Sequence, residues 1–110
     1  MPNVNDIISH THKVKISEKE LIKKAYHFAE KAHEGQKRNS GEPYFIHVFE
    51  TAKTLASLGM DTNTIVAGLL HDSLEDTKTE EEDLEKEFGS EIVGLVNGVT
   101  KLGIHRLQCR

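Results

Sequence analysis

The hydrophobic positions along the chain follow the pattern of amphipathic helices joined by short polar turns. Apolar residues recur every three or four positions, as on the buried face of a helix. No stretch alternates apolar and polar residues over several positions, as a half-buried strand would. The pattern therefore predicts an all-α fold of five to six helices in a single domain spanning residues 1–110.

Capping signals and glycines place the first helices. The Ser17–Glu20 spacing is that of a capping box, and the helix that follows should end at Gly35. A polar loop is expected over residues 36–43, followed by a helix over residues 44–58. Upstream of the capping box, four residues could dock on a core, in part as a short helix. They are Ile7, Ile8, Val14 and Ile16.

Three further segments complete the helical prediction. Asp61 or Thr62 can cap a helix that runs through residues 65–70 toward His71 and Asp72. Thr79 and Glu82 have the spacing of another capping box and open a short acidic helix that ends at residues 88–89. Ser90 is expected to cap a last apolar segment.

Composition narrows the class of protein. The chain has 36% hydrophobic and 29% charged residues and a formal charge of -4, which indicates an ordinary globular domain and argues against non-specific nucleic-acid binding. A single cysteine, Cys109, cannot form an internal disulfide. Neither a signal peptide nor a membrane span is evident, so we expect a cytoplasmic protein without nucleic-acid or membrane partners.

His71 and Asp72 are the first candidates for chemistry. An imidazole and a carboxylate side by side offer one nitrogen and one oxygen ligand to a divalent metal. Taken alone, the pair fits a polar helix end better. Glu75 and Asp76 follow four residues later and would share helix faces with them. Because the preceding residues 66–70 are apolar, these acidic side chains are expected to line a cleft rather than an exposed turn.

The loop before the second long helix carries the other candidates. The Arg38 guanidinium and the Ser40 hydroxyl suit contact with a base or with phosphate oxygens. His47, near the start of the following helix, could turn inward as a metal ligand. The other five histidines are expected to be solvated or packed without a functional role: His10, His12, His27, His33 and His105.

Several stretches, in order and with matching spacing, resemble the hydrolase domain of the RelA/SpoT (Rel/Spo) family over residues 20–103. The stretches are residues 25–29, 32–47, 64–77, 88–93 and 95–102. This resemblance implies an all-α HD domain that uses one Mn²⁺ ion to hydrolyse the 3′-pyrophosphate of the guanine nucleotide (p)ppGpp, the alarmone of the stringent response.

The resemblance also implies roles for individual residues. By position, the metal ligands would be His47, His71 and Asp72, and the acidic pair that positions or deprotonates the attacking water would be Glu75 and Asp76. The loop that contacts the guanine nucleotide corresponds to three residues: Arg38, Asn39 and Ser40.

The chain also departs from the family pattern. Val48 and Asn97 stand where Pro and Asp are common, and no Asp follows Asp83 to provide the family's remaining metal ligand. We therefore expect this chain to be the N-terminal part of the domain, without its C-terminal helices. Its turnover should be low, and the apolar surface left uncovered should favour self-association. Two alternatives stay open: an inactive remnant that binds a nucleotide or a protein, and an HD phosphohydrolase for another nucleotide.

Overall fold

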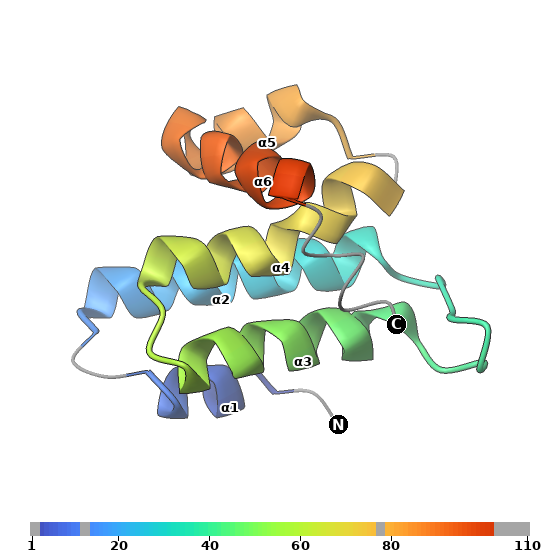
Figure 1. Ribbon diagram of the computed structural model, residues 1–110, viewed down its shortest axis with the longest axis horizontal. Coiled ribbons are helices and arrows are strands. Elements are labelled where there is room, and N and C mark those ends of the chain that lie inside the picture. The colour runs from blue at the N-terminus through green and yellow to red at the C-terminus, as the bar shows by residue number, and fades with distance from the viewer. Residues whose placement is uncertain (1–2, 12–13, 77–78, 103–110) are drawn as a thin grey trace.

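The computed structural model describes residues 3–11, 14–76 and 79–102, with the side chains of residues 74–76 and 99–102 excepted (Figure 1). Within this part of the chain every extended element is a helix, and an isolated bridge between Lys37 and Pro43 is the one strand-like feature. The helices are α1 (Val4–Ser9), α2 (Ile16–Ala32), α3 (Tyr44–Ser57), α4 (Thr62–Asp76), α5 (Glu81–Phe88) and α6 (Ser90–Leu102). The predicted all-α fold is confirmed.

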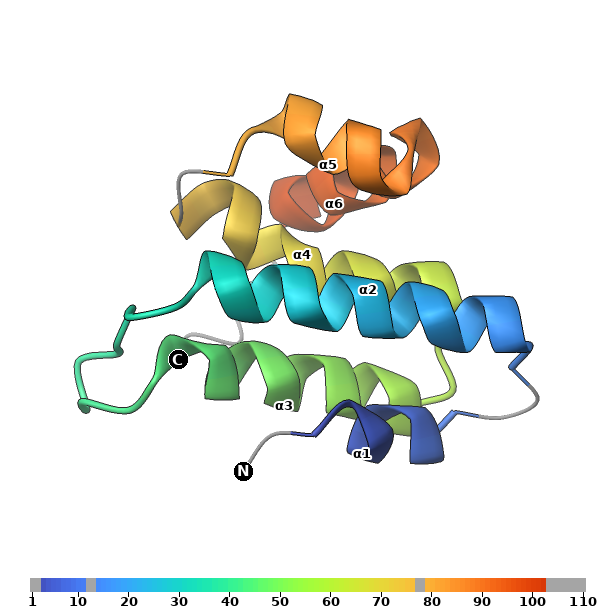
Figure 2. The same ribbon diagram turned by 180° about the vertical axis from the view of Figure 1, so that it is seen from behind.

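The long helices run back and forth along the molecule. In Figure 1, α2 runs toward the loop at residues 33–43, α3 returns from that loop, and α4 runs again in the direction of α2. Figure 2 shows the same order from behind, with α1 against the far end of α3 and with α5 and α6 on the opposite side of α4. The end of α2, the start of α3 and the end of α4 therefore lie at one end of the molecule.

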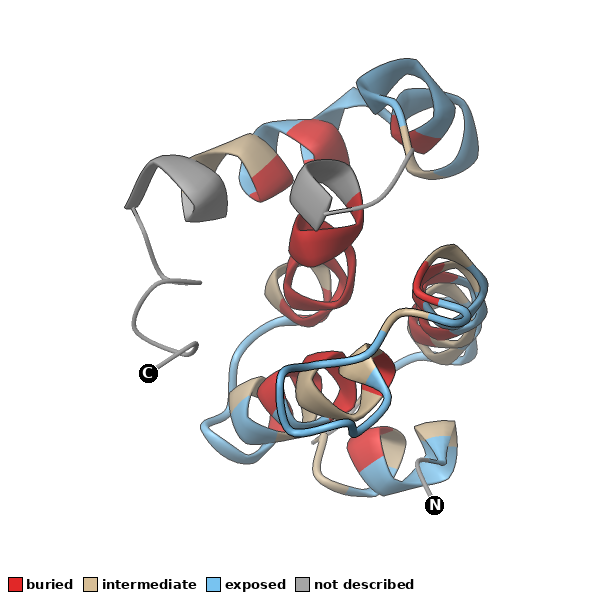
Figure 3. Cartoon of the chain, turned by 90° about the vertical axis from the view of Figure 1, so that its right-hand side faces the viewer, coloured by how far each residue is buried: buried red, intermediate tan, exposed pale blue. Residues whose placement is uncertain are grey.

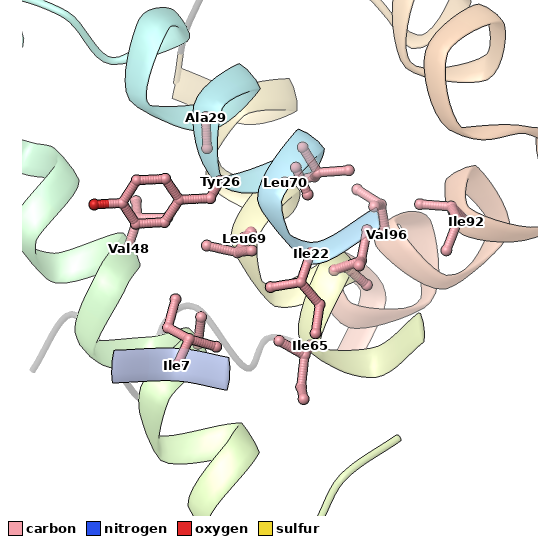
Figure 4. Close-up of a cluster of buried hydrophobic side chains, with 14 of the residues drawn as sticks. Ile7, Ile22, Tyr26, Ala29, Val48, Ile65, Leu69, Leu70, Ile92 and Val96 are labelled. Carbon is pink, nitrogen blue, oxygen red and sulfur yellow. The ribbon is translucent and has the colours of Figure 1, made fainter. Parts of the chain in front are cut away.

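Helix α4 is the centre of the core, because it packs against α2, α3 and α6. Its residues from Ile65 to Ser73 are all buried, and Figure 3 shows a fully buried stretch of helix at the centre of the molecule with further buried segments on the helices around it. In Figure 4, Leu69 and Leu70 of α4 lie among Ile22 and Tyr26 of α2. Burial of this apolar surface is the main term that favours the fold.

A glycine allows α4 to approach α3 closely. A Cβ atom added at Gly68 would lie 2.5 Å from Cδ1 of Leu55 on α3. The absence of a side chain at this position therefore lets the two helices pack closely, at the cost of lower helix propensity. This contact helps to fix where the last turns of α4, with His71 and Asp72, lie relative to α3.

Most predicted helix positions are confirmed. The expected helix over residues 44–58 is α3, the expected short N-terminal helix is α1, and its Ile7 is buried. Asp61 caps α4 by accepting a hydrogen bond from the Thr64 amide at 3.2 Å. No helix in the described part of the chain is long and apolar enough to cross a membrane, and the cellular location stays a prediction.

Three helix starts, those of α2, α5 and α6, were predicted wrongly. Helix α2 begins at Ile16 rather than after Ser17, and it is Glu18 whose carboxylate accepts the Lys15 amide at 2.9 Å. The same carboxylate accepts the Thr62 hydroxyl at 2.9 Å, so a contact with α4 favours this earlier start.

The other differences are at the starts of α5 and α6 and at Ile16. Helix α5 starts at Glu81 without a side-chain cap, whereas Thr79 was predicted to cap it. Ser90 is the first residue of α6 rather than the residue before it. Ile16, predicted to dock on the core, is 78% exposed.

Candidate functional site

The predicted site residues come from three elements that meet at one end of the molecule. The loop at residues 33–43 joins α2 to α3, and only residues 58–61 join α3 to α4. Because the latter connection is short, α3 and α4 run antiparallel, and the start of α3 lies beside the end of α4 (Figure 1). His47 on α3 and the His71–Asp72 pair on α4 are brought together in this way.

His71 and Asp72 are enclosed by the protein. Their side chains are 0% and 1% exposed, and His71 Nε2 lies 3.2 Å from Asp72 Oδ1. His71 Nδ1 lies 2.8 Å from the Gly68 carbonyl oxygen. Because a carbonyl only accepts, Nδ1 carries the proton of the neutral ring, and the lone pair is on Nε2, beside the carboxylate. A hydrogen bond at the other ring nitrogen is the arrangement that orients metal-binding histidines.

Polar atoms near this pair are buried without hydrogen bonds. Within the residues that the structure describes, this holds for both carboxylate oxygens of Asp72 and for Nε2 of His47. Burying a carboxylate without donors costs free energy, and a cation is one of the few groups that can offset the cost. The donor set, imidazole nitrogen with carboxylate oxygen, suits a divalent transition metal.

The electrostatic environment of His47 places it near the same groups. Burial lowers the pKa of His47 below its ordinary value of 6.5, and the negative charge of Asp72 opposes this shift. Electrostatic interactions with Arg38, His71 and His33 lower the pKa of His47 further. The neutral imidazole, the form that binds metals, is therefore favoured at His47.

These side chains do not yet form a closed cage. In the described part of the chain no three His, Cys, Asp or Glu side chains are grouped so that they could hold an ion as they stand. The structure brings His71 and Asp72 into contact and His47 within electrostatic range of both. The metal-ligand roles of the three residues therefore stay a prediction.

The loop with the predicted nucleotide contacts is closed on itself by backbone hydrogen bonds. The Arg38 amide donates to Glu42 O at 2.9 Å, and the Gly41 amide donates to Arg38 O at 2.8 Å. Gly41 has a φ of 90°, a conformation that favours glycine. The side chains of Arg38, Asn39 and Ser40 are all exposed. The loop is therefore a structured tip that presents a cation and two polar groups to solvent.

The acidic pair Glu75–Asp76 occupies the last turn of α4. The helix is thus continuous from His71 through Asp76, as the four-residue spacing required. The side chains of Glu75 and Asp76 lie outside the described residues, so their proposed action on water stays a prediction.

One buried histidine at this end was not singled out from the sequence. His33, at the C-terminus of α2, is 2% exposed and contacts Gln36, Tyr44 and Ser73. It is packed, as expected, but it lies among the candidate residues rather than apart from them. The helical pattern offered no signal for this, because the position follows the last turn of α2.

The chain is similar to known proteins with an HD domain. The family model described as HD domain matches residues 25–108. A guanosine-3′,5′-bis(diphosphate) 3′-pyrophosphohydrolase of Aquifex aeolicus is 54% identical over 84 residues, which cover 76% of this chain and 12% of the relative. A GTP pyrophosphokinase of Myxococcus xanthus is 54% identical over 83 residues, covering 76% of this chain and 11% of that protein.

A further relative, a guanosine-3′,5′-bis(diphosphate) 3′-pyrophosphohydrolase of Borreliella burgdorferi, is 49% identical over 85 residues, which cover 77% of the chain. The chain spans 11% to 13% of the length of these relatives. The matched region includes the loop, the start of α3 and the end of α4. The chain therefore belongs to the HD-domain family and, within it, to the RelA/SpoT family.

Proposed function

We propose that this chain carries the metal-binding part of a hydrolase site that removes the 3′-pyrophosphate of (p)ppGpp. The observation that carries the proposal is the buried Asp72 carboxylate, which lacks hydrogen bonds within the described residues and lies beside His71. Family membership supports the substrate, because two of the matched relatives are named for this hydrolysis.

The proposed ligands of a single divalent ion, Mn²⁺ by resemblance, are His47, His71 and Asp72. Their fit rests on the buried donor atoms and on the neutral form of His47. When bound, such an ion favours ionisation of water and offsets negative charge on phosphoryl oxygens. The protein's part is to hold the imidazole and carboxylate donors in fixed positions away from bulk water.

The remaining steps belong to side chains around this centre. Arg38, with Asn39 and Ser40, is proposed to bind the guanine nucleotide, because an exposed guanidinium can donate two hydrogen bonds to a phosphate. Glu75 and Asp76 are proposed to hold the attacking water and accept its proton. The negative charge of these carboxylates also explains why Arg38 and a cation would be required to attract a highly anionic substrate.

Metal binding is tested by NMR of the histidine rings during addition of Mn²⁺, which broadens the signals of nearby protons. Signals of His47 and His71 should broaden first, whereas those of His27, which is 67% exposed and paired with Glu30 on α2, should persist. Equal broadening of all histidines would contradict the proposed site.

Activity is tested by incubating the chain with ppGpp and Mn²⁺ and separating the products by chromatography. Release of pyrophosphate that disappears in His71→Ala and persists in His27→Ala supports hydrolysis. If the chain binds the nucleotide without any turnover, and this binding is unchanged in His71→Ala, the inactive binding module is favoured instead. Release of pyrophosphate or phosphate only from other nucleotides would favour an HD phosphohydrolase with a different substrate.

A further inference from the structure

A single buried imidazole touches all three elements of the proposed site. His33 lies at the C-terminus of α2, and its ring contacts the loop through Gln36, the start of α3 through Tyr44 and the end of α4 through Ser73. None of the proposed metal or nucleotide roles uses His33. We infer that His33 is a positioning residue, which fixes the Arg38 loop and the His47 ring relative to the His71–Asp72 pair.

Both ring nitrogens of His33 are engaged. Nδ1 lies 2.7 Å from Oε1 of Gln36, and Nε2 lies 3.3 Å from Oγ of Ser73. A neutral imidazole has one N–H and one lone pair, so Nδ1–H donates to the amide oxygen and the Ser73 hydroxyl donates to Nε2. With its lone pair used in this way, His33 does not act as a metal ligand itself. It links the loop to the residue that directly follows Asp72.

The connection to the loop continues along the backbone. The Gln36 amide donates to the His33 carbonyl oxygen, and the Gln36 carbonyl oxygen accepts the Tyr44 amide, both at 2.9 Å. Gln36 is thus tied at its side chain, its amide and its carbonyl, immediately before the turn that carries Arg38. Removing the imidazole would release the side-chain tie between the loop and the C-terminus of α2.

A second connection reaches the predicted ligand on α3. The His33 ring stacks on Tyr44, with centroids 5.1 Å apart and planes at 26°. Tyr44 in turn meets His47 edge to face, with centroids 5.6 Å apart. The Tyr44 ring therefore lies against both imidazoles and limits the orientations open to His47. A metal site gains affinity when the groups around its ligands fix their orientation, and loss of such groups typically weakens binding 10- to 100-fold.

The inference rests on the proposed function only for its consequence for metal binding, because the ordering of the loop and of the His47 ring can be measured without metal. The variants are His33→Leu, which removes both hydrogen bonds, and His33→Asn, whose amide can replace Nδ1 toward Gln36. Ser73→Ala keeps the imidazole and its bond to Gln36 but removes the hydroxyl that meets Nε2. Because alanine favours the helix, this variant should fold even where His33→Leu is weakened. His27→Leu is the matched control, since His27 is an exposed histidine on the same helix.

NMR spectra of the metal-free chain should show altered His47 ring signals and faster amide exchange at residues 38–41 in His33→Leu, with the amide protection restored in His33→Asn. Ser73→Ala should alter the His47 ring signals less than His33→Leu does. Titration with Mn²⁺ should give binding about tenfold weaker for His33→Leu than for His27→Leu.

The outcomes separate the two proposals. The positioning role is overturned if His33→Leu and His27→Leu have the same amide exchange in the loop and the same His47 ring signals, whatever their metal affinities. If the wild-type chain does not bind Mn²⁺, the metal site is contradicted. A loop that exchanges faster in His33→Leu supports the positioning role even then.

Discussion

The buried carboxylate of Asp72 should lower the free energy of unfolding of the metal-free protein, relative to a variant with an apolar side chain at this position. Asp72 is 1% exposed, and within the described residues neither oxygen has a hydrogen-bond partner. Replacing it by leucine, a side chain of comparable size, removes the buried charge and adds apolar contacts next to the core residues of α4. We therefore expect Asp72→Leu to stabilise the chain when no metal is present.

The magnitude follows from two contributions. A buried polar group without a partner costs about 1–3 kcal/mol, and exchanging buried ionic groups for apolar ones of similar volume is commonly neutral or stabilising by about 1–4 kcal/mol. An increase of about 1–3 kcal/mol in the free energy of unfolding is expected. For a domain of this size each kcal/mol raises the melting temperature by roughly 4–8 °C.

Urea unfolding in EDTA and in Mn²⁺, followed by circular dichroism, provides the measurement. In EDTA the variant should be the more stable protein. At a free Mn²⁺ concentration 100 times the Kd of the site, the free energy of unfolding of the wild type should increase by about 2.7 kcal/mol. That of the variant should not change. The difference in stability between the two proteins should therefore shrink or reverse when metal is added.

The control is Asp83→Leu, which removes an exposed carboxylate from α5 and should change stability by less than about 0.5 kcal/mol in either buffer. If Asp72→Leu instead lowers the stability of the metal-free chain by more than about 1 kcal/mol, the fold itself satisfies the carboxylate. Asp72 would then need no cation, which contradicts the proposed metal site.

Three further predictions concern the fold. Leu69→Ala, at a position with no exposed surface, should cost about 2–5 kcal/mol in urea unfolding because it leaves a cavity in the core. Hydrogen bonds from a backbone amide and from the Thr62 hydroxyl hold the pKa of Glu18 below its ordinary value of 4.5. The Glu18 carboxylate therefore stabilises the fold above pH 4.5, and this stabilisation is lost as the pH falls through the lower pKa that Glu18 has in the folded protein. Melting temperatures measured from pH 7 to pH 2.5 should accordingly fall more for the wild type than for Glu18→Gln, and parallel curves would contradict this. Gly94 lies in α6 with open space around it, so Gly94→Ala should raise the free energy of unfolding by up to about 1 kcal/mol in urea unfolding. Gly41 is equally open but has a φ of 90°, so Gly41→Ala should lower the free energy of unfolding by about 1–2 kcal/mol.

Much of the fold could be predicted from local pattern. The helix expected over residues 44–58 is observed as Tyr44–Ser57, and the cap at Asp61 is observed as well. These features depend on spacing within one helix and on side chains that bond to their own backbone, both of which are visible in the sequence. The candidate residues His71 and Asp72 were also found in this way, since they adjoin each other and follow an apolar run.

Other features depended on contacts between distant segments. Glu18, not Ser17 with Glu20, closes the start of α2, and its carboxylate also bonds to Thr62, 44 residues away. Ile16 has the right type for the core yet is 78% exposed, whereas Glu18 in the same turn of α2 contacts Thr62 of α4. Local pattern contains no information about which neighbours a helix end will meet.

The sequence by itself determined that this protein is all-α and where most helices lie, and it indicated candidate residues for binding a metal or a nucleotide. Only the tertiary structure decided that the Asp72 carboxylate is buried without hydrogen bonds within the described residues and that His33 joins the loop, α3 and α4. The physical reason is that helix periodicity is a local property, whereas burial and hydrogen-bond partners depend on how close the helices approach, as Gly68 allows α4 to approach α3.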